Sequence, residues 1–266
     1  MTDDQAGLSF SFDYRYRHNQ DIYRGSSELK NPADVSTTFQ QYSLSGAWKV
    51  NDELILRASL PFTNAVREEN GAPDSTINGV GDAAISALFK PWSGDDSILG
   101  GVGFTFGLVL PTGEAKDQPR VGIASPSVFQ LGTGTTQLTL GAQYAAQFDD
   151  WSFLTFVQTT VPLDESSKGF RPAETVFLSA GIGRPITDKL SARFSLDLFH
   201  GGRDEVDGLA ISNTGSTTLS LSPSIVYRLR DDFAISGSVS LPLYRDVNQT
   251  QLVAAPLWSL GLNYSF

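Results

Sequence analysis

The sequence predicts an all-β protein, a transmembrane antiparallel up-and-down β-barrel of about twelve strands, and three observations lead to it. Large apolar residues alternate with small or polar ones along most of the chain, the connections between these segments alternate in length, and the final segment ends in an aromatic residue. No run reaches the roughly 18 consecutive apolar residues that a membrane helix needs, so strands are the elements expected to cross a bilayer.

The alternation is clearest in three segments. In residues 102–110 the even-numbered positions hold valine, phenylalanine or leucine, whereas glycine and threonine hold most of the odd-numbered ones. Residues 190–198 set leucine, alanine and phenylalanine against serine, arginine and aspartate, and residues 233–243 repeat the pattern with serine and alanine. Alternation of this kind puts the large apolar side chains on one face of a strand.

Twelve such segments can be counted, and most are 11–14 residues long, close to the length that a tilted strand needs to cross a bilayer. The expected strands are residues 7–17, 37–50, 54–65, 79–91, 98–111, 136–148, 151–162, 174–187, 190–200, 216–229, 233–244 and 254–266. The weakest is 151–162, because Phe153, Leu154, Phe156 and Val157 leave its outward face undecided.

Short and long connections follow each other in turn. The short ones are 51–53, 92–96, 149–150, 187–189 and 230–232, and the long ones are 18–36, 66–78, 112–135, 163–173, 201–215 and 245–253. Outer-membrane barrels have short periplasmic turns and longer extracellular loops, whereas a soluble sandwich has no reason to alternate them. We therefore expect residues 1–266 to form a single outer-membrane β-barrel domain with both ends on the periplasmic side.

The composition fits an exported barrel. Hydrophobic residues make up 40% of the chain, as expected where only every second strand residue faces lipid. Cysteine is absent, which excludes disulfides, thiolate metal sites and a cysteine nucleophile. The first residues resemble no signal peptide, so we expect the mature form of a protein of the bacterial outer membrane, with Met1 added at its start.

The last predicted strand alternates large apolar residues with serine, glycine and asparagine and ends on an aromatic residue. It resembles the C-terminal signature of bacterial outer-membrane proteins, which implies recognition by the barrel-assembly machinery. The residues of this assembly signal are Trp258, Leu260, Leu262, Tyr264 and Phe266. The alternative, an edge strand that ends a soluble β-protein, would be an aggregation hazard.

The opposite parity selects the residues that face the lumen. Barrels of about eight strands are filled by side chains and those of about sixteen leave an aqueous channel, so twelve strands predict a narrow passage. Charged residues of both signs at lumen positions either pair across strands or constrict a permeation path, and both readings stay open. The expected lumen and constriction residues are Asp13, Arg15, Arg57, Asp82, Lys90, Arg193, Asp197 and Arg228.

Three short motifs follow one another along the chain. They are Gly79–Asp82, Leu110–Glu114 and, after Ser125-Pro126, Leu131–Gly134. This series resembles the outer-membrane family named for the meta-pathway of phenol degradation, over roughly residues 35–266. The resemblance implies a barrel channel of the kind often associated with uptake of aromatic or hydrophobic compounds, and it implies no catalytic residue.

The predicted function is a passive outer-membrane diffusion channel for small solutes, hydrophobic or aromatic compounds among them. A structural or adhesive barrel without transport is one alternative, and an outer-membrane enzyme of the lipase or protease type is another. Such an enzyme needs a nucleophile or activated water beside a positioned base, and only His18 and His200 are available. Asp197 lies three residues before His200, so their side chains have opposite parity, and we expect no enzyme.

No cofactor or metal is expected. The acidic segment 204–208 has carboxylates two residues apart, as in Ca²⁺ sites, but lacks a complete series of ligands. The formal charge of −10 lies mostly in the long loops, which suits lipopolysaccharide bridged by divalent cations and excludes nucleic acid. The expected partners are outer-membrane lipid, lipopolysaccharide, the barrel-assembly machinery and a small-molecule solute. Residues 112–135 are the loop expected to fold inward.

Overall fold

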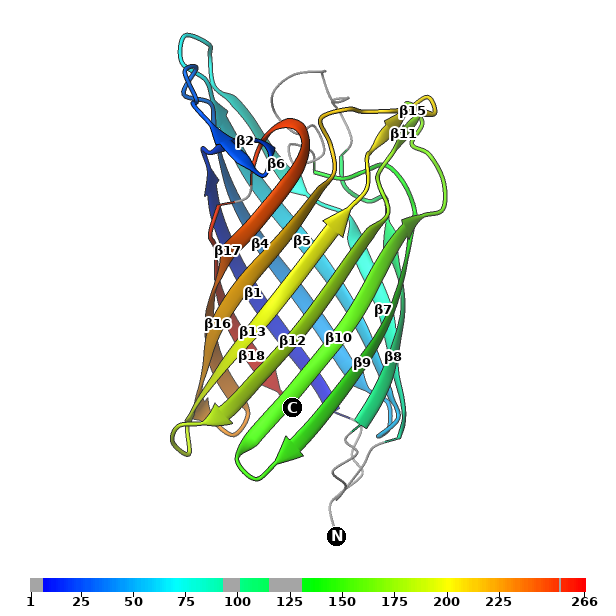
Figure 1. Ribbon diagram of the computed structural model, residues 1–266. Coiled ribbons are helices and arrows are strands. Elements are labelled where there is room, and N and C mark those ends of the chain that lie inside the picture. The colour runs from blue at the N-terminus through cyan, green and yellow to red at the C-terminus, as the bar shows by residue number, and fades with distance from the viewer. Residues whose placement is uncertain (1–6, 93–100, 115–130, 254) are drawn as a thin grey trace.

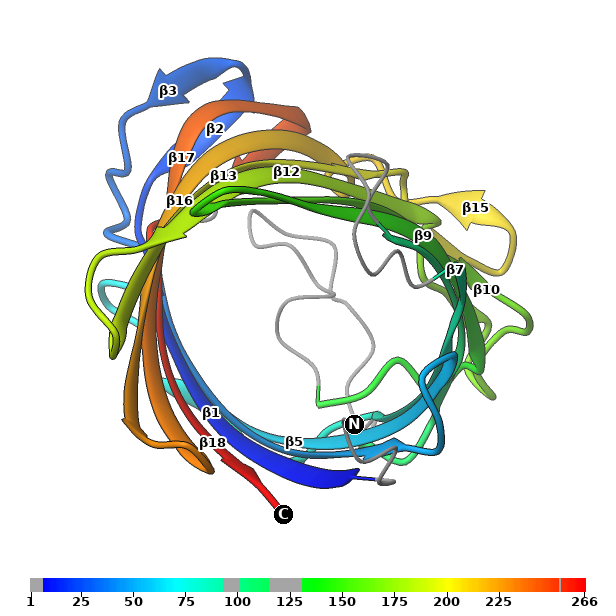
Figure 2. The same ribbon diagram turned by 90° about the horizontal axis from the view of Figure 1, so that it is seen from below.

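The protein is a closed antiparallel β-barrel (Figure 1). The computed structural model describes residues 7–92, 101–114, 131–253 and 255–266. Within them, no helix is long and apolar enough to cross a membrane. Viewed along its axis, the wall forms one continuous ring (Figure 2). The start of β1 and the end of the chain lie on the side of the short turns, since Gly7 pairs with Lys49 and the N–H of Ser265 donates to Asp232.

Twelve wall positions make up the ring, one of them shared by two consecutive strands. Their order is the order of the chain, and the last strand pairs with the first through eight residue pairs, from Ser9 opposite Ser265 to Tyr16 opposite Trp258. The wall strands are β1 Gly7–Asn19, β4 Ser36–Lys49, β5 Leu54–Glu68, β6 Ser75–Val80 with β7 Ala83–Trp92, β8 Gly101–Leu110, β9 Gln137–Phe148, β10 Trp151–Pro162, β12 Thr175–Pro185, β13 Leu190–Gly201, β16 Ser216–Arg230, β17 Phe233–Leu252 and β18 Leu257–Ser265.

The fourth wall position differs from the single strand predicted for residues 79–91. There β6 pairs with the extracellular half of β5 and β7 with its periplasmic half. Residues 81–83 lie opposite only residues 60–61 of β5, so one residue is in excess and the strand breaks. Pro61 contributes because it has no N–H to donate, while its carbonyl accepts the N–H of Gly81 at 2.8 Å.

The predicted long loop 245–253 is wrong, because β17 continues to Leu252. A β-bulge explains the difference. Ser220 pairs with Pro242 but Leu219 pairs with Tyr244, so Leu243 has no partner and the parity of β17 reverses after it. Only residues 253–256 then connect β17 to β18.

The other long connections carry short strands of their own. Residues 18–36, predicted as one loop, contain the end of β1 and a hairpin, β2 Ile22–Gly25 and β3 Ser27–Leu29, which extends the wall by pairing β2 with β17. Further on, β11 Phe170–Arg171, β14 Glu205–Val206 and β15 Leu209–Ala210 form a small separate sheet at the extracellular end (Figure 1).

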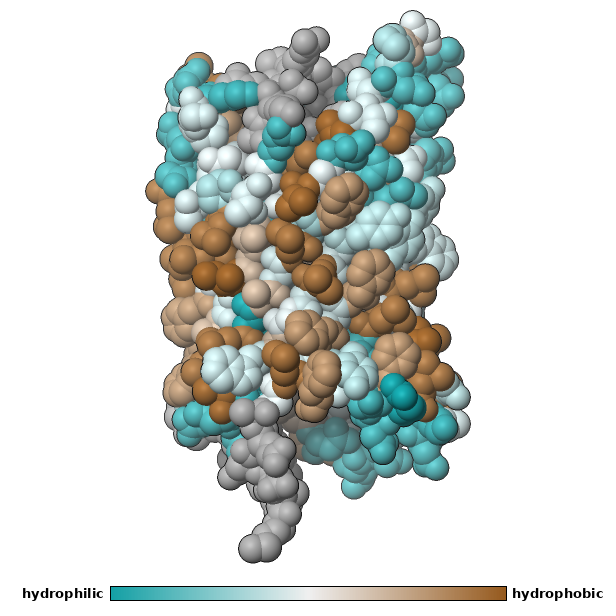
Figure 3. Space-filling model, turned by 180° about the vertical axis from the view of Figure 1, so that it is seen from behind, coloured by the Kyte–Doolittle hydropathy of each residue, from teal (hydrophilic) through white to brown (hydrophobic). Residues whose placement is uncertain are grey.

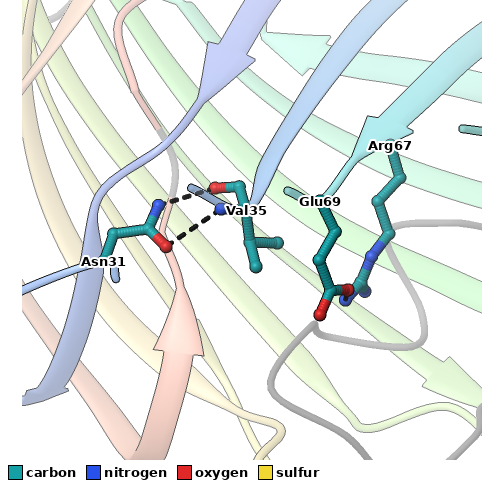
Figure 4. A network of polar contacts seen from close by, with 4 residues as sticks. All are labelled: Asn31, Val35, Arg67 and Glu69. Atoms are coloured by element: carbon teal, nitrogen blue, oxygen red, sulfur yellow. Dashed lines mark hydrogen bonds and ion pairs between the residues drawn. The ribbon is translucent and has the colours of Figure 1, made fainter. Parts of the chain in front are cut away.

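Side-chain hydrogen bonds hold the loop that follows β3 (Figure 4). The amide of Asn31 donates to the carbonyl oxygen of Val35 at 2.8 Å and accepts the N–H of Val35 at 2.9 Å. Val35 is 1% exposed and packs with Ile22 and Leu252 in the apolar cluster of this end. Nearby, Arg67 Nη2 lies 3.1 Å from Glu69 Oε2 (Figure 4).

The wall has an apolar outer face. Outward residues such as Leu196 and Trp258 are half exposed or more, and apolar side chains cover the middle of the wall between hydrophilic ends (Figure 3). The register also decides β10, since Phe156 and Gln158 pair with the lumen-facing Ser179 and Phe177, and Phe153 and Val157 therefore face outward. The predicted alternation of faces is thus confirmed where the register can be followed.

Candidate functional site

The candidate site is the lumen of the barrel, where two cavities lie within the ring of strands. The lower cavity, in the periplasmic half, has a volume of about 420 Å³ and is lined mostly by serine, alanine and glycine. Arg57 is the one charged residue among the described residues that line it. Because most lining side chains are small, this half of the lumen is wide, and the guanidinium of Arg57 is surrounded by neutral groups.

The upper cavity, in the extracellular half, is larger, with a volume of about 750 Å³. Its lining combines serine and threonine with three arginines, Arg15, Arg17 and Arg245, and with the aromatic rings of Phe177 and Phe199. Charged and polar groups in such numbers need water or partners, because an isolated charge in a dry interior is very costly. The described lining residues therefore indicate that the upper cavity is hydrated and has aromatic patches.

Asp197 lies at the centre of a group of serines on the wall of the upper cavity. Its Oδ1 accepts a hydrogen bond from Ser179 on β12 at 2.6 Å, and its Oδ2 accepts one from Ser195 on the same strand at 3.3 Å. Ser222 on β16 also donates to Oδ2, and its hydroxyl is 3.1 Å from Ser240 on β17. This Asp197 cluster joins four neighbouring strands through side chains that face inward.

Arg193 lies flat against the wall. Its Nη2 is 3.5 Å from the carbonyl oxygen of Leu154, and a β-carbon built on Gly181 would meet its Nε at 2.9 Å. Glycine at 181 therefore makes room for the guanidinium to cross β12 towards β10. Asp13, on β1, accepts a hydrogen bond from Ser11 at 3.3 Å.

Asp82 holds the two ends of a loop instead of standing alone in the lumen. Its Oδ1 accepts the N–H of Gly113 at 2.9 Å, and its Oδ2 accepts the N–H and the hydroxyl of Thr133 at 2.8 and 3.0 Å. Thr112 adds a hydrogen bond from its hydroxyl to the carbonyl oxygen of Gly81 at 3.0 Å. We call this group, Gly81, Asp82, Thr112, Gly113 and Thr133, the loop junction.

Glycines make the loop junction possible. A β-carbon on Gly113 would lie within 2.9 Å of backbone atoms of Gly81, Leu131 and Gly132, closer than real side chains approach. The three motifs noted in the sequence, Gly79–Asp82, Leu110–Glu114 and Leu131–Gly134, thus meet at one place although they lie far apart in the chain. Most of the predicted inward loop, residues 115–130, and Ser125-Pro126 within it, lie outside the described residues.

The remaining predicted residues lie at the periplasmic ends of strands. The N–H of Lys90 donates to Glu53 at 2.6 Å and that of Arg228 to Lys189 at 2.8 Å, and both acceptors belong to short turns. The predicted set is therefore spread over the length of the barrel: Arg15 and Asp197 line the upper cavity and Arg57 the lower one. That these charges constrict a permeation path stays a prediction.

Aromatic residues of the lumen were missed at the sequence level. The rings of Phe156 and Phe177 are 5.4 Å apart, and Arg17 lies 5.5 Å above the ring of Phe39. Phe199 shares the parity of Asp197 and lines the same cavity as Phe177. Parity alone could have identified Phe177 and Phe199, but large apolar residues at inward positions contradict the simple rule of polar residues inside.

The two histidines lie away from the lumen carboxylates. Nδ1 of His18 is 2.9 Å from the hydroxyl of Thr38, and Nδ1 of His200 is 2.9 Å from that of Thr217. Each pair joins neighbouring strands on the outer face, near the extracellular end.

With the geometry in place, comparison with known proteins gives the family. Residues 5–252 match the family described as "Putative MetA-pathway of phenol degradation". The chain belongs to this family. Its loop junction is built from the motifs that carried the resemblance in the sequence. A search of curated proteins found no match for this member of the phenol-degradation family.

Solved structures confirm the barrel fold. An outer-membrane channel from Pseudomonas putida F1 is 15% identical over 100% of this chain and 97% of its own, with a TM-score of 0.78. The β domain of the Bordetella autotransporter BrkA is 13% identical over 98% and 100%, with a TM-score of 0.59. The translocator domain of the autotransporter NalP from Neisseria meningitidis is 14% identical over 99% and 90%, with a TM-score of 0.57. At these identities the similarity shows the fold alone.

Proposed function

We propose that this protein is a passive outer-membrane diffusion channel for small solutes, hydrophobic or aromatic compounds among them. The two cavities inside the ring carry the proposal, because serine, threonine, glycine and arginine line them where a purely structural barrel would pack apolar side chains. A lumen of this kind holds water, and a solute can exchange with that water without crossing a packed core.

The comparisons support a channel without deciding it. The family is named for a phenol-degradation pathway, and the similar barrel of Pseudomonas putida is described as an outer-membrane channel. Autotransporter domains share the same architecture, so the fold alone does not distinguish transport of a solute from other uses of a barrel. A structural or adhesive barrel without transport is the alternative that the experiment must test.

An enzyme is disfavoured by where the histidines lie. A hydrolase of the lipase or protease type needs its base within hydrogen-bond reach of the group that it activates. His18 and His200 each contact a threonine on the outer face, and the Asp197 cluster faces the lumen. The described residues therefore hold no pairing of histidine and carboxylate that resembles a hydrolase.

The test combines planar-bilayer conductance with liposome swelling on one preparation, using charged, sugar and aromatic solutes. The preparation must first show heat-modifiable gel mobility, because a closed barrel resists detergent until it is boiled. We expect measurable ion currents or solute uptake. A barrel that passes neither, and still passes neither after residues 112–135 are shortened, would support the structural alternative and overturn the proposal.

The proposal extends to the partners of the barrel. We propose that residues 1–266 form a single barrel domain. We also propose that its acidic extracellular loops bind lipopolysaccharide through divalent cations, and that the barrel-assembly machinery recognises β18. The side chains of Trp258, Leu260 and Phe266 are 57–74% exposed at the outer face, where another protein can reach them. Replacing Phe266 with serine should lower the amount of folded barrel in the outer membrane, measured on unboiled gels.

A further inference from the structure

We propose that the upper cavity binds an aromatic carboxylate, with the acid group at Arg15, Arg17 and Arg245 and the ring at Phe177 and Phe199. This inference rests on the proposed function and names the chemical class of the solute. It goes beyond a general preference for aromatic compounds, because it requires a negative charge on the ligand.

The arginines of β1 have no anionic partner among the residues that the structure describes. Arg15 and Arg17 are two residues apart on one strand, so both side chains point into the same cavity. Neither forms an ion pair with a residue that the structure describes. Nε of Arg17 is shielded from solvent and has no hydrogen-bond partner there, and its guanidinium lies over Phe39. A cation that is only partly solvated and lacks a counter-ion favours an anion from solution.

The two carboxylates that line the same cavity are already engaged. Asp197 accepts hydrogen bonds from three serines, and Asp204, which is 6% exposed, accepts the N–H of Ala173 at 2.9 Å. Hydrogen bonds from the wall to Asp197 and from an extracellular loop to Asp204 hold these anions where they are. Neither of these described carboxylates thus pairs with the guanidinium groups of β1, which can bind a carboxylate of the solute through two parallel hydrogen bonds.

The aromatic part of the cavity stands on strands other than those of the arginines. Phe177 is on β12 and Phe199 on β13, whereas Arg15 and Arg17 are on β1 and Arg245 is on β17. A ligand that contacts both the phenylalanines and the arginines needs an aromatic ring at one end and a negative charge at the other. Aromatic faces prefer offset or edge contacts with another ring, as Phe177 already makes with Phe156. A benzoate-like acid has both features.

The acidic extracellular loops do not contradict this site. Charges in water are screened beyond about 8 Å at physiological ionic strength, so the loops repel an anion only near the mouth. Inside the barrel, low-dielectric walls concentrate the field of the arginines. An anion that passes the mouth therefore meets attraction in the upper cavity.

The experiment measures equilibrium binding to the whole protein in lipid nanodiscs by ¹⁹F NMR, with empty nanodiscs as the blank. The probes are 4-fluorobenzoate, its neutral counterpart 4-fluorobenzamide, and the non-aromatic acid 4-fluorocyclohexanecarboxylate. We expect 4-fluorobenzoate to bind most tightly. The double variant Arg15→Gln/Arg17→Gln should weaken its binding about tenfold or more, because the charge-assisted hydrogen bonds are lost. Binding of the amide should change less than about twofold, since it carries no charge to lose.

Matched variants separate the site from a general effect of charge. Arg230→Gln removes an exposed arginine of the periplasmic turn, which pairs with Asp232 at 3.2 Å, and should change no probe. Phe177→Leu/Phe199→Leu should remove the preference for the aromatic acid over the cyclohexane acid. All variants must keep heat-modifiable mobility.

Three outcomes would overturn the inference: equal binding of acid and amide, unchanged acid binding in the arginine variant, or equal loss in Arg230→Gln. Failure of the channel itself is a separate result, because conductance and swelling are measured independently. Binding without passage would contradict the proposed function, and passage of neutral solutes without acid binding would contradict only this inference.

Discussion

Two aspartates of the barrel wall, predicted to have the same role, serve different structures. Asp82 lies where the wall is interrupted between β6 and β7, and it accepts hydrogen bonds from backbone N–H groups at both ends of a loop. Asp197 lies on the regular strand β13, and it accepts hydrogen bonds from serine side chains of its own strand and of the two neighbouring strands. Two of the three hydrogen bonds to Asp82 come from backbone N–H groups, whereas all the donors to Asp197 are hydroxyl groups that can rotate.

Asp82 thus determines the position of backbone segments beside the lumen, whereas Asp197 determines the charge inside it. Backbone donors have fixed directions, so the loop junction depends on the carboxylate of Asp82. Hydroxyl groups can turn to donate or accept, so the Asp197 cluster tolerates a neutral amide in the same place. Substitutions should therefore affect folding at Asp82 and selectivity at Asp197.

The largest effect is expected from arginine substitutions on the outer, lipid-facing side of the wall, among them one at Leu196, next to Asp197. Leu196→Arg, like Phe104→Arg and Val239→Arg, places a cation in lipid and should cost about 2–4 kcal/mol in the free energy of unfolding. Arginine at the lumen positions Thr105 or Ser238 should leave the free energy of unfolding largely intact and change conductance. Urea titration into lipid vesicles measures both groups, and equal costs would show that the register used for the comparison is wrong.

At the loop junction, Asp82→Ala should cost about 1–3 kcal/mol in the free energy of unfolding, because part-buried backbone donors lose a charged acceptor. Trypsin cleavage after Lys116 or Arg120 should also become faster, because the loop junction no longer holds the two ends of this segment. Asp82→Asn should have a smaller effect, since the amide oxygen still accepts one hydrogen bond.

Asp74→Ala, in the exposed loop before β6, is the matched control for loss of an acidic loop residue. It should leave stability and cleavage unchanged. If trypsin cleaved the Asp74→Ala and Asp82→Ala variants at the same rate, the loop junction would have no role in holding the loop.

Asp197→Asn should barely change stability and should change ion selectivity. Loss of one negative charge from the upper cavity should raise the ratio of anion to cation permeability about two- to threefold, because the low-dielectric wall concentrates the field. Reversal potentials in a salt gradient measure the ratio. An unchanged potential would mean that ions do not pass near this carboxylate.

The smallest effect is expected from Arg57→Gln/Arg193→Gln. Selectivity should shift towards cations, but by less than about twofold. Arg193 lies against the wall beside the carbonyl oxygen of Leu154, and Arg57 is the one charged lining residue of a wide cavity, where water and salt screen it. The same reversal potentials apply. A shift as large as that of Asp197→Asn, in the opposite direction, would place these cations in the main path of the ions.

The number of strands and the faces of most of them could be predicted from the sequence, because a period of two is repeated in nearly every wall strand. The extension of β17 could not be predicted, because the bulge at Leu243 reverses the alternation of outward and inward residues along the strand. The break between β6 and β7 was hidden as well, because its cause is an excess residue opposite β5, and register is not visible in one strand.

The candidate site was predicted less completely than the fold. Parity assigned Asp197 to the lumen, but only the structure shows its three serine partners, one on its own strand and two on the neighbouring strands, 18 and 25 residues away. Asp82 was predicted as a lumen charge because the loop that it holds starts 31 residues later in the chain. Hydrogen bonds across such distances follow from the fold, and local patterns do not contain them.

Closure of the ring has a consequence for how the cell makes this protein. The first wall strand, β1, finds its second partner only when β18 is available, so the unfinished sheet carries two open edges throughout its synthesis. Open edges recruit strands from other molecules. A late frameshift that destroys β18 would therefore leave a nearly complete chain that is a greater hazard to its neighbours than an early truncation.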